Sequence, residues 1–318
     1  MANNILEVQG LCKKYKDFAL QDVTFAVPKG FIMGFIGQNG AGKTTTIKSI
    51  LNITNADSGQ IKIFDKWVLR CRAGSPNNGA DNSTENNGKI GVVMDAPMYV
   101  DDWTVADVER AVSPFYSDWN SEKYAKYTKQ FGLDEKKKVK DLSRGMKVKL
   151  QIAAALSHDA ELLILDEPTS GLDPVARDEI CDLLREFVAD ENKSVFFSTH
   201  ITTDLEKTAD FITFILDGRI VFTGAKDDLL GKYARVTGGL NEVTNEHKKL
   251  LIGCREHSTG FEGMVEIDVL PKFPKDVLAE SITLDEIIIF MTKAKQEPKG
   301  ELCLPDGLTK KEETRKNG

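Results

Sequence analysis

The sequence predicts an α/β protein built on a mainly parallel sheet with crossover helices. Short apolar runs of strand length alternate along the chain with stretches whose apolar residues recur at helical spacing. The predicted strands are Gly30–Ile36, Ile61–Phe64, Ile90–Met94, Leu162–Leu165, Val195–Ser198 and Phe211–Leu216. The predicted helices are Lys43–Leu51, Val105–Tyr116 and Val175–Val188. With 318 residues, of which 41% are apolar, the chain can bury a sizeable core.

Capping residues mark three helix starts. Thr104 with Asp107, and Thr283 with Glu286, match the pairs in which two side chains satisfy each other's backbone N–H groups. Asp173, followed by a proline, combines an N-cap acid with the residue that best fits the first helical position. We therefore expect helices to begin at these three points.

The pattern of residues divides the chain into a large domain, a small domain and a tail. The alternation of strands and helices runs over residues 1–230, which form the predicted large domain. A small α+β appendage is expected over 235–296, followed by a polar, mobile tail over 298–318. Within the large domain, residues 72–88 are rich in Asn, Gly and Ser and predict a flexible surface loop.

The appendage carries no recognisable motif, but its apolar residues form a pattern. Val265, Ile267 and Val269 alternate with acids as in a half-buried strand, and residues 284–292 have helical spacing. This is more apolar surface than a unit of about 60 residues buries alone. We therefore expect the appendage to pack on the large domain or on a second copy and to stabilise a dimer.

Composition and charge exclude several classes of protein. The chain has 42 basic and 49 acidic residues, a net charge of −7 and a pI of about 5.3, which argues against a nucleic-acid partner. Because no apolar run approaches the roughly 18 residues that span a bilayer, and no signal peptide pattern opens the chain, we expect a cytoplasmic protein. The five cysteines lack metal spacing and are expected to be reduced thiols.

A glycine-rich loop follows the first predicted strand. Residues 37–44 have the sequence GQNGAGKT, which fits the phosphate-binding pattern G-x-x-x-x-G-K-[ST]. The glycines let backbone N–H groups turn inward around a phosphate, and the following helix offers its positive N-terminus. Lys43 is expected to reach the β- and γ-phosphates, and the Thr44 hydroxyl to bind Mg²⁺. The predicted binding residues are Gly37, Gln38, Asn39, Gly40, Ala41, Gly42, Lys43, Thr44 and Thr45.

Two acids close another buried strand, in which residues 162–165 are followed by Asp166 and Glu167. The carboxyl ends of parallel strands meet at the edge of the sheet where ligands bind. Asp166 is expected to hold Mg²⁺ through water, and Glu167 is well placed to act as general base for an attacking water. An apolar run that ends in two acids is common by itself, but together with the phosphate loop it predicts nucleotide hydrolysis.

In order and spacing these motifs resemble the ATP-binding cassette (ABC) ATPases. Residues 142–146 (LSRGM) lie where that family has its LSGGQ signature. Residues 170–173 resemble its D-loop, and residues 198–200 end in a histidine similar to its switch histidine. Tyr15 stands where the family has an aromatic residue that stacks on adenine. The resemblance covers about residues 5–230 and is closest to single-cassette ATPases of bacterial multidrug, bacitracin and peptide exporters.

The resemblance implies a P-loop NTPase fold with a helical signature subdomain at about 96–158. It also implies that two cassettes pair head to tail, each enclosing ATP between its own phosphate loop and the signature of the other. Ser143 and Gly145 would then contact the γ-phosphate bound by the opposite chain. Arg144 and Asp173 join the implied nucleotide-binding residues.

The implied catalytic residues are Glu167 and His200, where His200 would hydrogen-bond the γ-phosphate and hold the water near Glu167. Structural roles remain as alternatives for three of the implied residues. His200 could be a satisfied core histidine and Tyr15 an ordinary tyrosine. Ser143 could be a helix N-cap, a role compatible with nucleotide contact.

Two sites depart from the family pattern. Arg144 and Met146 replace the first Gly and the Gln of LSGGQ, so the helix start presents an extra cation. Asp95 occupies the place of the Q-loop glutamine, which in the family approaches Mg²⁺ and senses the transmembrane partner. A carboxylate is a harder oxygen ligand, so Asp95 joins Thr44 and Asp166 as a predicted metal ligand. A solvated loop acid is the alternative for Asp95.

The function implied by the resemblance is that of an ATP-hydrolysing subunit of an ABC exporter for peptide or drug-like cargo. ATP and Mg²⁺ are the implied cofactors, and a separate transmembrane permease and a second ATPase chain, identical or different, are the implied partners. The chain would lie on the inner face of the cell membrane through the permease. A soluble ABC ATPase acting on a ribosome or nucleic acid is the alternative, although such proteins usually carry two cassettes or a long coiled coil. A kinase or GTPase is a third possibility, against which the signature and the switch histidine count.

Overall fold

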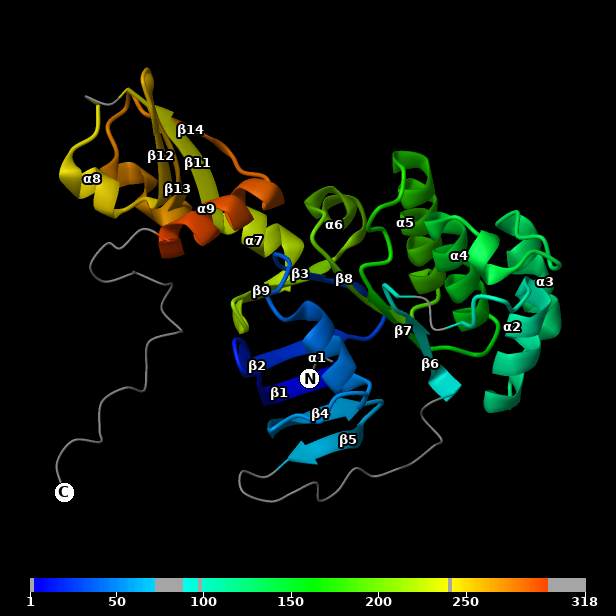
Figure 1. The fold of residues 1–318 in the computed structure, drawn as a ribbon. Helices are drawn as coiled ribbons and strands as arrows, with labels where there is room; N and C mark the ends of the chain where they lie inside the picture. The colour runs from blue at the N-terminus through cyan, green and yellow to red at the C-terminus, as the bar shows by residue number, and fades with distance from the viewer. Residues whose placement is uncertain (1–2, 72–87, 97–98, 240–241, 297–318) are drawn as a thin grey trace, which may run out of the picture. The chain divides into compact units, whose positions relative to one another are not determined.

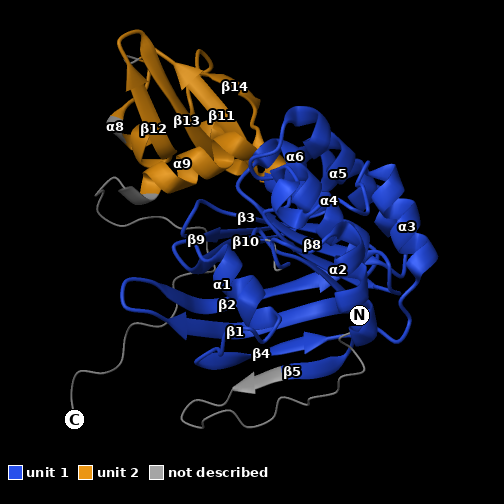
Figure 2. Cartoon of the chain, turned by 45° about the vertical axis from the view of Figure 1, so that its right-hand side comes forward, with its two compact units in different colours: residues 1–229 blue, residues 230–318 orange. Residues whose placement is uncertain are grey.

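The computed structural model describes residues 3–71, 88–96, 99–239 and 242–296 (Figure 1). The chain forms two compact units, residues 1–229 and 230–318 (Figure 2). The predicted loop, except for its last residue, and the predicted tail lie outside the described residues.

A six-stranded sheet is the centre of the first unit, with the order β10-β9-β3-β8-β7-β6. Its strands are β3 (Ile32–Ile36), β6 (Ile90–Val93), β7 (Leu162–Asp166), β8 (Ser194–Thr199), β9 (Phe211–Leu216) and β10 (Arg219–Ala225). All neighbouring pairs are parallel except β9 and β10. Every residue of β3, β7 and β8 is buried, which explains why apolar residues follow one another in the middle of these strands. The predicted mainly parallel sheet is therefore confirmed.

A separate antiparallel sheet has the order β2-β1-β4-β5. Its strands are β1 (Asn4–Lys14), β2 (Ala19–Pro28), β4 (Ser58–Ile63) and β5 (Lys66–Cys71). The apolar run at 61–64 belongs to this sheet, so its predicted place in the parallel sheet is wrong. Phe64 and Asp65 both have positive φ (50° and 62°) and form a two-residue turn that folds β5 back on β4.

Among the described residues, six α-helices accompany these sheets: α1 (Lys43–Ile50), α2 (Val105–Val112), α3 (Ser121–Gln130), α4 (Arg144–Ala155), α5 (Pro174–Val188) and α6 (Thr202–Thr208). The capping pair of Thr104 and Asp107 and the N-cap of Asp173 are confirmed. The helix predicted over 105–116 ends at Val112 and continues as a 3₁₀ turn, Ser113–Phe115. Its proline, at 114, has no N–H group with which to extend the α-helical ladder.

The helices α2, α3 and α4 enclose a core of their own. Figure 1 shows them grouped beyond β6 and β7. Tyr124 is buried in this core, and its hydroxyl donates to the carbonyl oxygen of Val105 at 2.8 Å. The buried members are Val105, Val108, Tyr124, Leu133, Val139, Leu142, Leu150, Ala153 and Ala154. Because α4 also packs on β6, the helical part is anchored to the parallel sheet.

The second unit is a four-stranded antiparallel sheet with helices, in the order β12-β13-β11-β14. Its elements are β11 (Tyr233–Gly238), α8 (Asn245–Lys249), β12 (Ile252–His257), β13 (Gly260–Glu266), a 3₁₀ helix (Ile267–Lys272), β14 (Leu278–Ser281) and α9 (Leu284–Gln296), and α7 (Lys226–Lys232) crosses the boundary. The helix α9 packs on β12 and β13. Its predicted start is confirmed, because Thr283 and Glu286 cap each other's backbone N–H groups.

One expectation for this unit is wrong. The strand predicted through Val269 ends at Glu266, and Ile267, which is 41% exposed, begins a 3₁₀ helix. Pro271 lies within that helix, and a proline cannot donate to a sheet ladder. The unit also has its own core, in which Val265 packs with Phe261 and other buried residues. Packing of this unit on the large domain or on a second copy, and a role in stabilising a dimer, stay predictions.

Candidate active site

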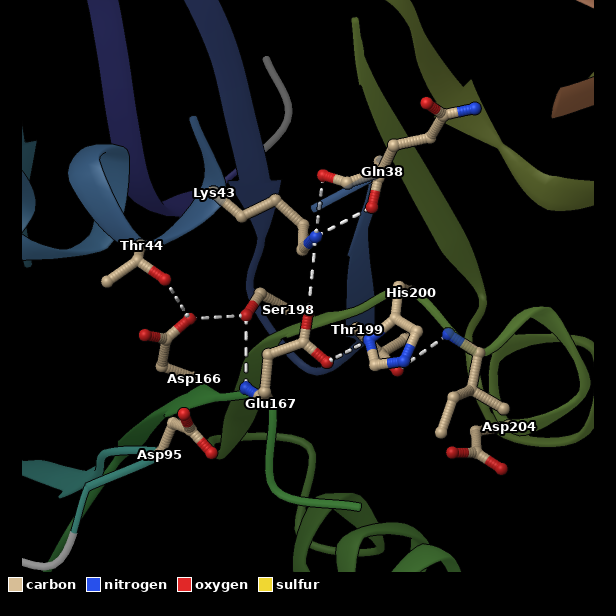
Figure 3. Close-up of polar contacts among 12 residues, drawn as sticks. Gln38, Lys43, Thr44, Asp95, Asp166, Glu167, Ser198, Thr199, His200 and Asp204 are labelled. Carbon is tan, nitrogen blue, oxygen red and sulfur yellow. Dashed lines mark hydrogen bonds and ion pairs between the residues drawn. The ribbon is translucent and has the colours of Figure 1, made fainter. Parts of the chain in front are cut away.

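The parallel sheet brings the predicted site residues together at one edge. Three adjacent strands end there: β3 before the glycine-rich loop, β7 at Asp166 and β8 before His200. The register places Asp166 opposite Ser198, and Ile36 opposite Thr199. Figure 3 shows the resulting cluster, whose members come from distant parts of the sequence.

The phosphate-binding loop holds Lys43 in a buried position. Its Nζ donates to the carbonyl oxygens of Gly37 (2.6 Å) and Gln38 (3.2 Å). Gly42 has a φ of +112°, and a Cβ there would lie 2.6 Å from a methyl group of Leu20. Glycine is therefore required just before α1. No side chain caps the start of α1, so its first N–H groups remain available to an anion.

Glu167 connects the loop to the predicted switch histidine. Its Oε1 lies 3.1 Å from Lys43 Nζ, and its Oε2 lies 2.7 Å from His200 Nδ1 (Figure 3). The backbone of Glu167 has a φ of +53°, which costs a residue with a side chain about 1–2 kcal/mol. The two ends of its carboxylate thus join a buried cation to a histidine. This arrangement fits a general base beside a phosphate site.

Asp166 is almost fully buried beside the start of α1. Its Oδ1 accepts hydrogen bonds from Ser198 Oγ (2.7 Å) and Thr44 Oγ1 (3.2 Å). Burial raises the pKa of the Asp166 carboxyl, and these two hydroxyl groups offset part of the rise. No described cluster of three or more His, Cys, Asp and Glu residues forms a metal cage. A hydroxyl and a carboxylate nevertheless suit Mg²⁺, which usually takes few protein ligands besides substrate phosphates and water.

The residues of the resembled signature lie at the start of α4. Ser143 Oγ accepts from Met146 N at 3.3 Å, so the N-cap role considered for Ser143 is present. Arg144 Nη2 lies 2.6 Å from Asp95 Oδ1. Asp95 is also close enough to Asp166 for its negative charge to contribute to the raised pKa of Asp166. It therefore borders the predicted metal position while it pairs with a cation.

Tyr15, Asp173 and Gly145 lie outside the chain of contacts from Lys43 to His200. The ring of Tyr15 is exposed, with the Lys13 ammonium 5.6 Å from its centroid. Asp173 caps α5 through the N–H groups of Val175 and Ala176. A role for these residues at a nucleotide stays a prediction.

Two further side chains organise the site, and their roles were not predicted. Ser198 Oγ donates to Asp166 and also accepts from the Glu167 N–H at 3.1 Å, so it orients both acids. Gln151 is buried on α4, and its amide bonds both to the N–H and to the carbonyl of Met94, each at 3.1 Å. For Gln151, the only feature of the sequence that points to such a role is that a polar residue stands between apolar neighbours in α4.

Comparison with known proteins identifies the family. A family model described as ABC transporter matches residues 20–170. The lantibiotic transport ATP-binding protein SrtF of Streptococcus pyogenes is 34% identical over 219 residues, which cover 68% of this chain and 89% of that protein. The chain belongs to the ABC transporter family. This ABC ATPase is an enzyme that binds and hydrolyses ATP.

Two further similarities support the assignment of this ABC ATPase. The bacitracin transport ATP-binding protein BcrA of Enterococcus faecalis is 32% identical over 220 residues, 68% of each chain. The solved structure of an ATP-binding subunit of an ABC transporter is 28% identical with a TM-score of 0.61, and the match covers 71% of this chain and 91% of the other. The fold predicted from the resemblance is confirmed.

The buried carboxylate of Asp166 generates a prediction about stability. Without nucleotide or divalent metal, Asp166→Asn is expected to raise the free energy of unfolding at pH 8 by about 1 kcal/mol, or a few degrees in the melting temperature. The folded state raises the pKa of Asp166 above its unfolded value, near 4. The ionised carboxylate therefore destabilises the fold above that pH, fully so above the folded pKa.

Thermal unfolding of the chain and the variant at pH 5 and pH 8, in EDTA, measures this difference. The stabilisation should be larger at pH 8. Asp178→Asn, which changes an exposed acid paired with Lys207, is the control and should show little change at either pH. A melting temperature lowered by Asp166→Asn at pH 8 would contradict the argument.

Proposed function

We propose that this ABC ATPase powers a separate membrane permease that exports a peptide antibiotic or a similar drug-like molecule. The observation that carries the catalytic part is the chain of contacts from Lys43 through Glu167 to His200 at the sheet edge. The names of the relatives, which are transport proteins for bacitracin and lantibiotics, support the cargo class. Among the described residues, none of the helices combines the length and apolarity that crossing a bilayer requires.

Each group at the sheet edge has a role in the proposed reaction. ATP binds with its β- and γ-phosphates between Lys43 and the N-terminus of α1, so Lys43 exchanges Glu167 for phosphate oxygens. Glu167 then accepts a proton from water, whose oxygen bonds to the γ-phosphorus while the bond from that phosphorus to the bridging oxygen of ADP breaks. His200, held by Glu167, orients this water and the γ-phosphate.

The proposed metal site uses Thr44 and Asp166, with Asp95 beside them. These residues fit Mg²⁺ because their oxygen atoms converge next to the start of the loop helix. When bound, Mg²⁺ neutralises charge that develops on the transferred phosphoryl group. The hydrogen bond from Ser198 Oγ orients the Asp166 carboxylate before the ion binds.

The proposed assembly pairs two cassettes head to tail, with Ser143, Gly145 and Asp173 facing the nucleotide of the opposite chain. Through the permease, the pair would be held at the inner face of the membrane. A role on ribosomes or nucleic acid is not favoured, because the relatives are transport proteins and the net charge is −7.

Glu167→Gln tests the proposed general base. The variant should bind ATP but hydrolyse it about 10²–10⁴ times more slowly, because the amide cannot accept the proton. ATP turnover and ATP binding measured on the purified full chain separate the two effects.

Glu161→Gln is the matched control for this variant. Glu161 precedes the same strand at its opposite end and pairs with Lys89, away from the site. Its turnover should stay near that of the parent. If Glu167→Gln hydrolysed ATP as fast as Glu161→Gln, Glu167 would not be the base.

Purification of the tagged chain from detergent-solubilised membranes tests the proposed partner. We expect one multi-span permease to be recovered in stoichiometric amount, because export requires a pore that the described helices do not supply. A tagged chain with Lys43→Ala, which removes the ammonium group from the phosphate loop, serves to show whether recovery depends on nucleotide. Recovery of ribosomes or nucleic acid instead of a permease would support the alternative function.

A further inference from the structure

Two of the three positions that depart from the family pattern, Asp95 and Arg144, contact each other. Arg144 Nη2 and Asp95 Oδ1 are 2.6 Å apart, although 49 positions separate the residues in sequence. Each side chain is 52% exposed. The glutamine and glycine that the resembled family has at these positions could not form an ion pair. The two departures are therefore complementary in charge.

Arg144 also lies against the loop that resembles the D-loop. A Cβ on Gly171 would lie 3.2 Å from Arg144 Nε and 3.3 Å from its Cζ. Gly171 has a φ of +69°, which also favours glycine. The guanidinium thus bridges three segments: the residue after Met94, the start of α4, and the loop before α5.

The backbone next to Asp95 is fixed by the same helix that carries Arg144. Gln151, on α4, is 4% exposed and bonds to both backbone groups of Met94. Because α4 supplies both Gln151 and Arg144, the ion pair is supported on a rigid base. A surface pair of two long, free side chains would lack this support.

We propose that the Asp95–Arg144 pair is a latch between two states of the site. Asp95 holds the Arg144 guanidinium within its own chain, and Arg144 leaves Asp95 for the γ-phosphate of ATP bound by a second chain when two cassettes close. The inference rests on the proposed function, because it requires head-to-tail pairing. Arg144 is the phosphate contact in this scheme, and Asp95 is a positioning residue.

The chemistry of the guanidinium makes this exchange possible. Its planar set of N–H donors binds a carboxylate and a phosphate with similar geometry. One charge-assisted contact replaces another, so the exchange requires no unpaired cation. Closing of the dimer must nevertheless overcome the contact with Asp95, and the latch therefore sets how much ATP is needed for closure.

The experiment measures ATP-dependent dimerisation of the full chain in a Glu167→Gln background, by sedimentation velocity over a range of ATP concentrations with excess Mg²⁺. Adding Asp95→Asn should lower the ATP concentration for half-maximal dimerisation about two- to fivefold. In this variant the ion pair is absent, so closure of the dimer does not have to break it. Adding Asp95→Glu, which retains the charge, should move it back toward the parent value.

Removal of the arginine should have the opposite effect. Arg144→Gly should raise the required ATP concentration about tenfold or more, because a charged contact to phosphate is lost. In that background Asp95→Asn should cause no further shift, as a double-mutant cycle requires of residues that act through each other.

Asp182→Asn is the matched control. It breaks an exposed pair of the same residue types, Asp182 with Arg185 on α5, whose side chains are 62% and 47% exposed. It should leave the ATP dependence unchanged.

An Asp95→Asn shift that persists in full with Arg144→Gly would overturn the latch, because Asp95 would then act on the nucleotide directly. The absence of any shift from Asp95→Asn would also overturn it, while leaving the proposed function intact. If the Glu167→Gln chain bound ATP but never dimerised, both the proposed head-to-tail pairing and the latch would be contradicted.

Discussion

The ion pair between Lys43 and Glu167 is the interaction on which the site depends. It joins the loop after β3 to the end of β7 with side chains that are only 4% and 11% exposed. Removing two charges from water costs several kcal/mol per ion unless further partners satisfy them. Lys43 has the carbonyl oxygens of Gly37 and Gln38, and Glu167 has His200. The site therefore holds its charges in fixed positions where phosphates can replace one of the partners.

The parallel sheet makes this pair possible. The strands β3, β8 and β7 are neighbours, so the segments that follow them lie within contact distance at one edge. Ser198 then links the two acids through a single hydroxyl group, and the strained backbone of Glu167 is retained because its carboxylate is held at both ends. The helix α4 holds a further segment next to the site, because its Gln151 bonds to Met94 and its Arg144 pairs with Asp95.

Local patterns predicted the parallel sheet, the phosphate loop and the acids because each depends on contiguous residues. Fully buried strands contain several apolar residues in a row. The glycines of the loop at 37–44 are required by its backbone conformation. Local patterns do not show which strand pairs with which. The run at 61–64 belongs to another sheet, and the turn that pairs β4 with β5 contains no glycine that would have marked it. Four strands of the first unit were not predicted: β1, β2, β5 and β10. Their sequences mix polar and apolar residues, and such strands have weaker sequence signals than fully buried ones. The hydrogen bonds of Ser198 and Gln151, and the contact of Asp95 with Arg144, depend on tertiary placement, which no local pattern encodes.

The most direct test of the central claim is the equilibrium binding of ATP to Lys43→Ala, measured by calorimetry on the full chain. If Lys43 exchanges Glu167 for phosphate oxygens, the variant should bind ATP at least about tenfold more weakly, because a charge-assisted contact to phosphate is lost. Lys48→Ala, in the last turn of the same helix, should bind ATP as the parent does. Equal ATP affinity for Lys43→Ala and Lys48→Ala would contradict the account.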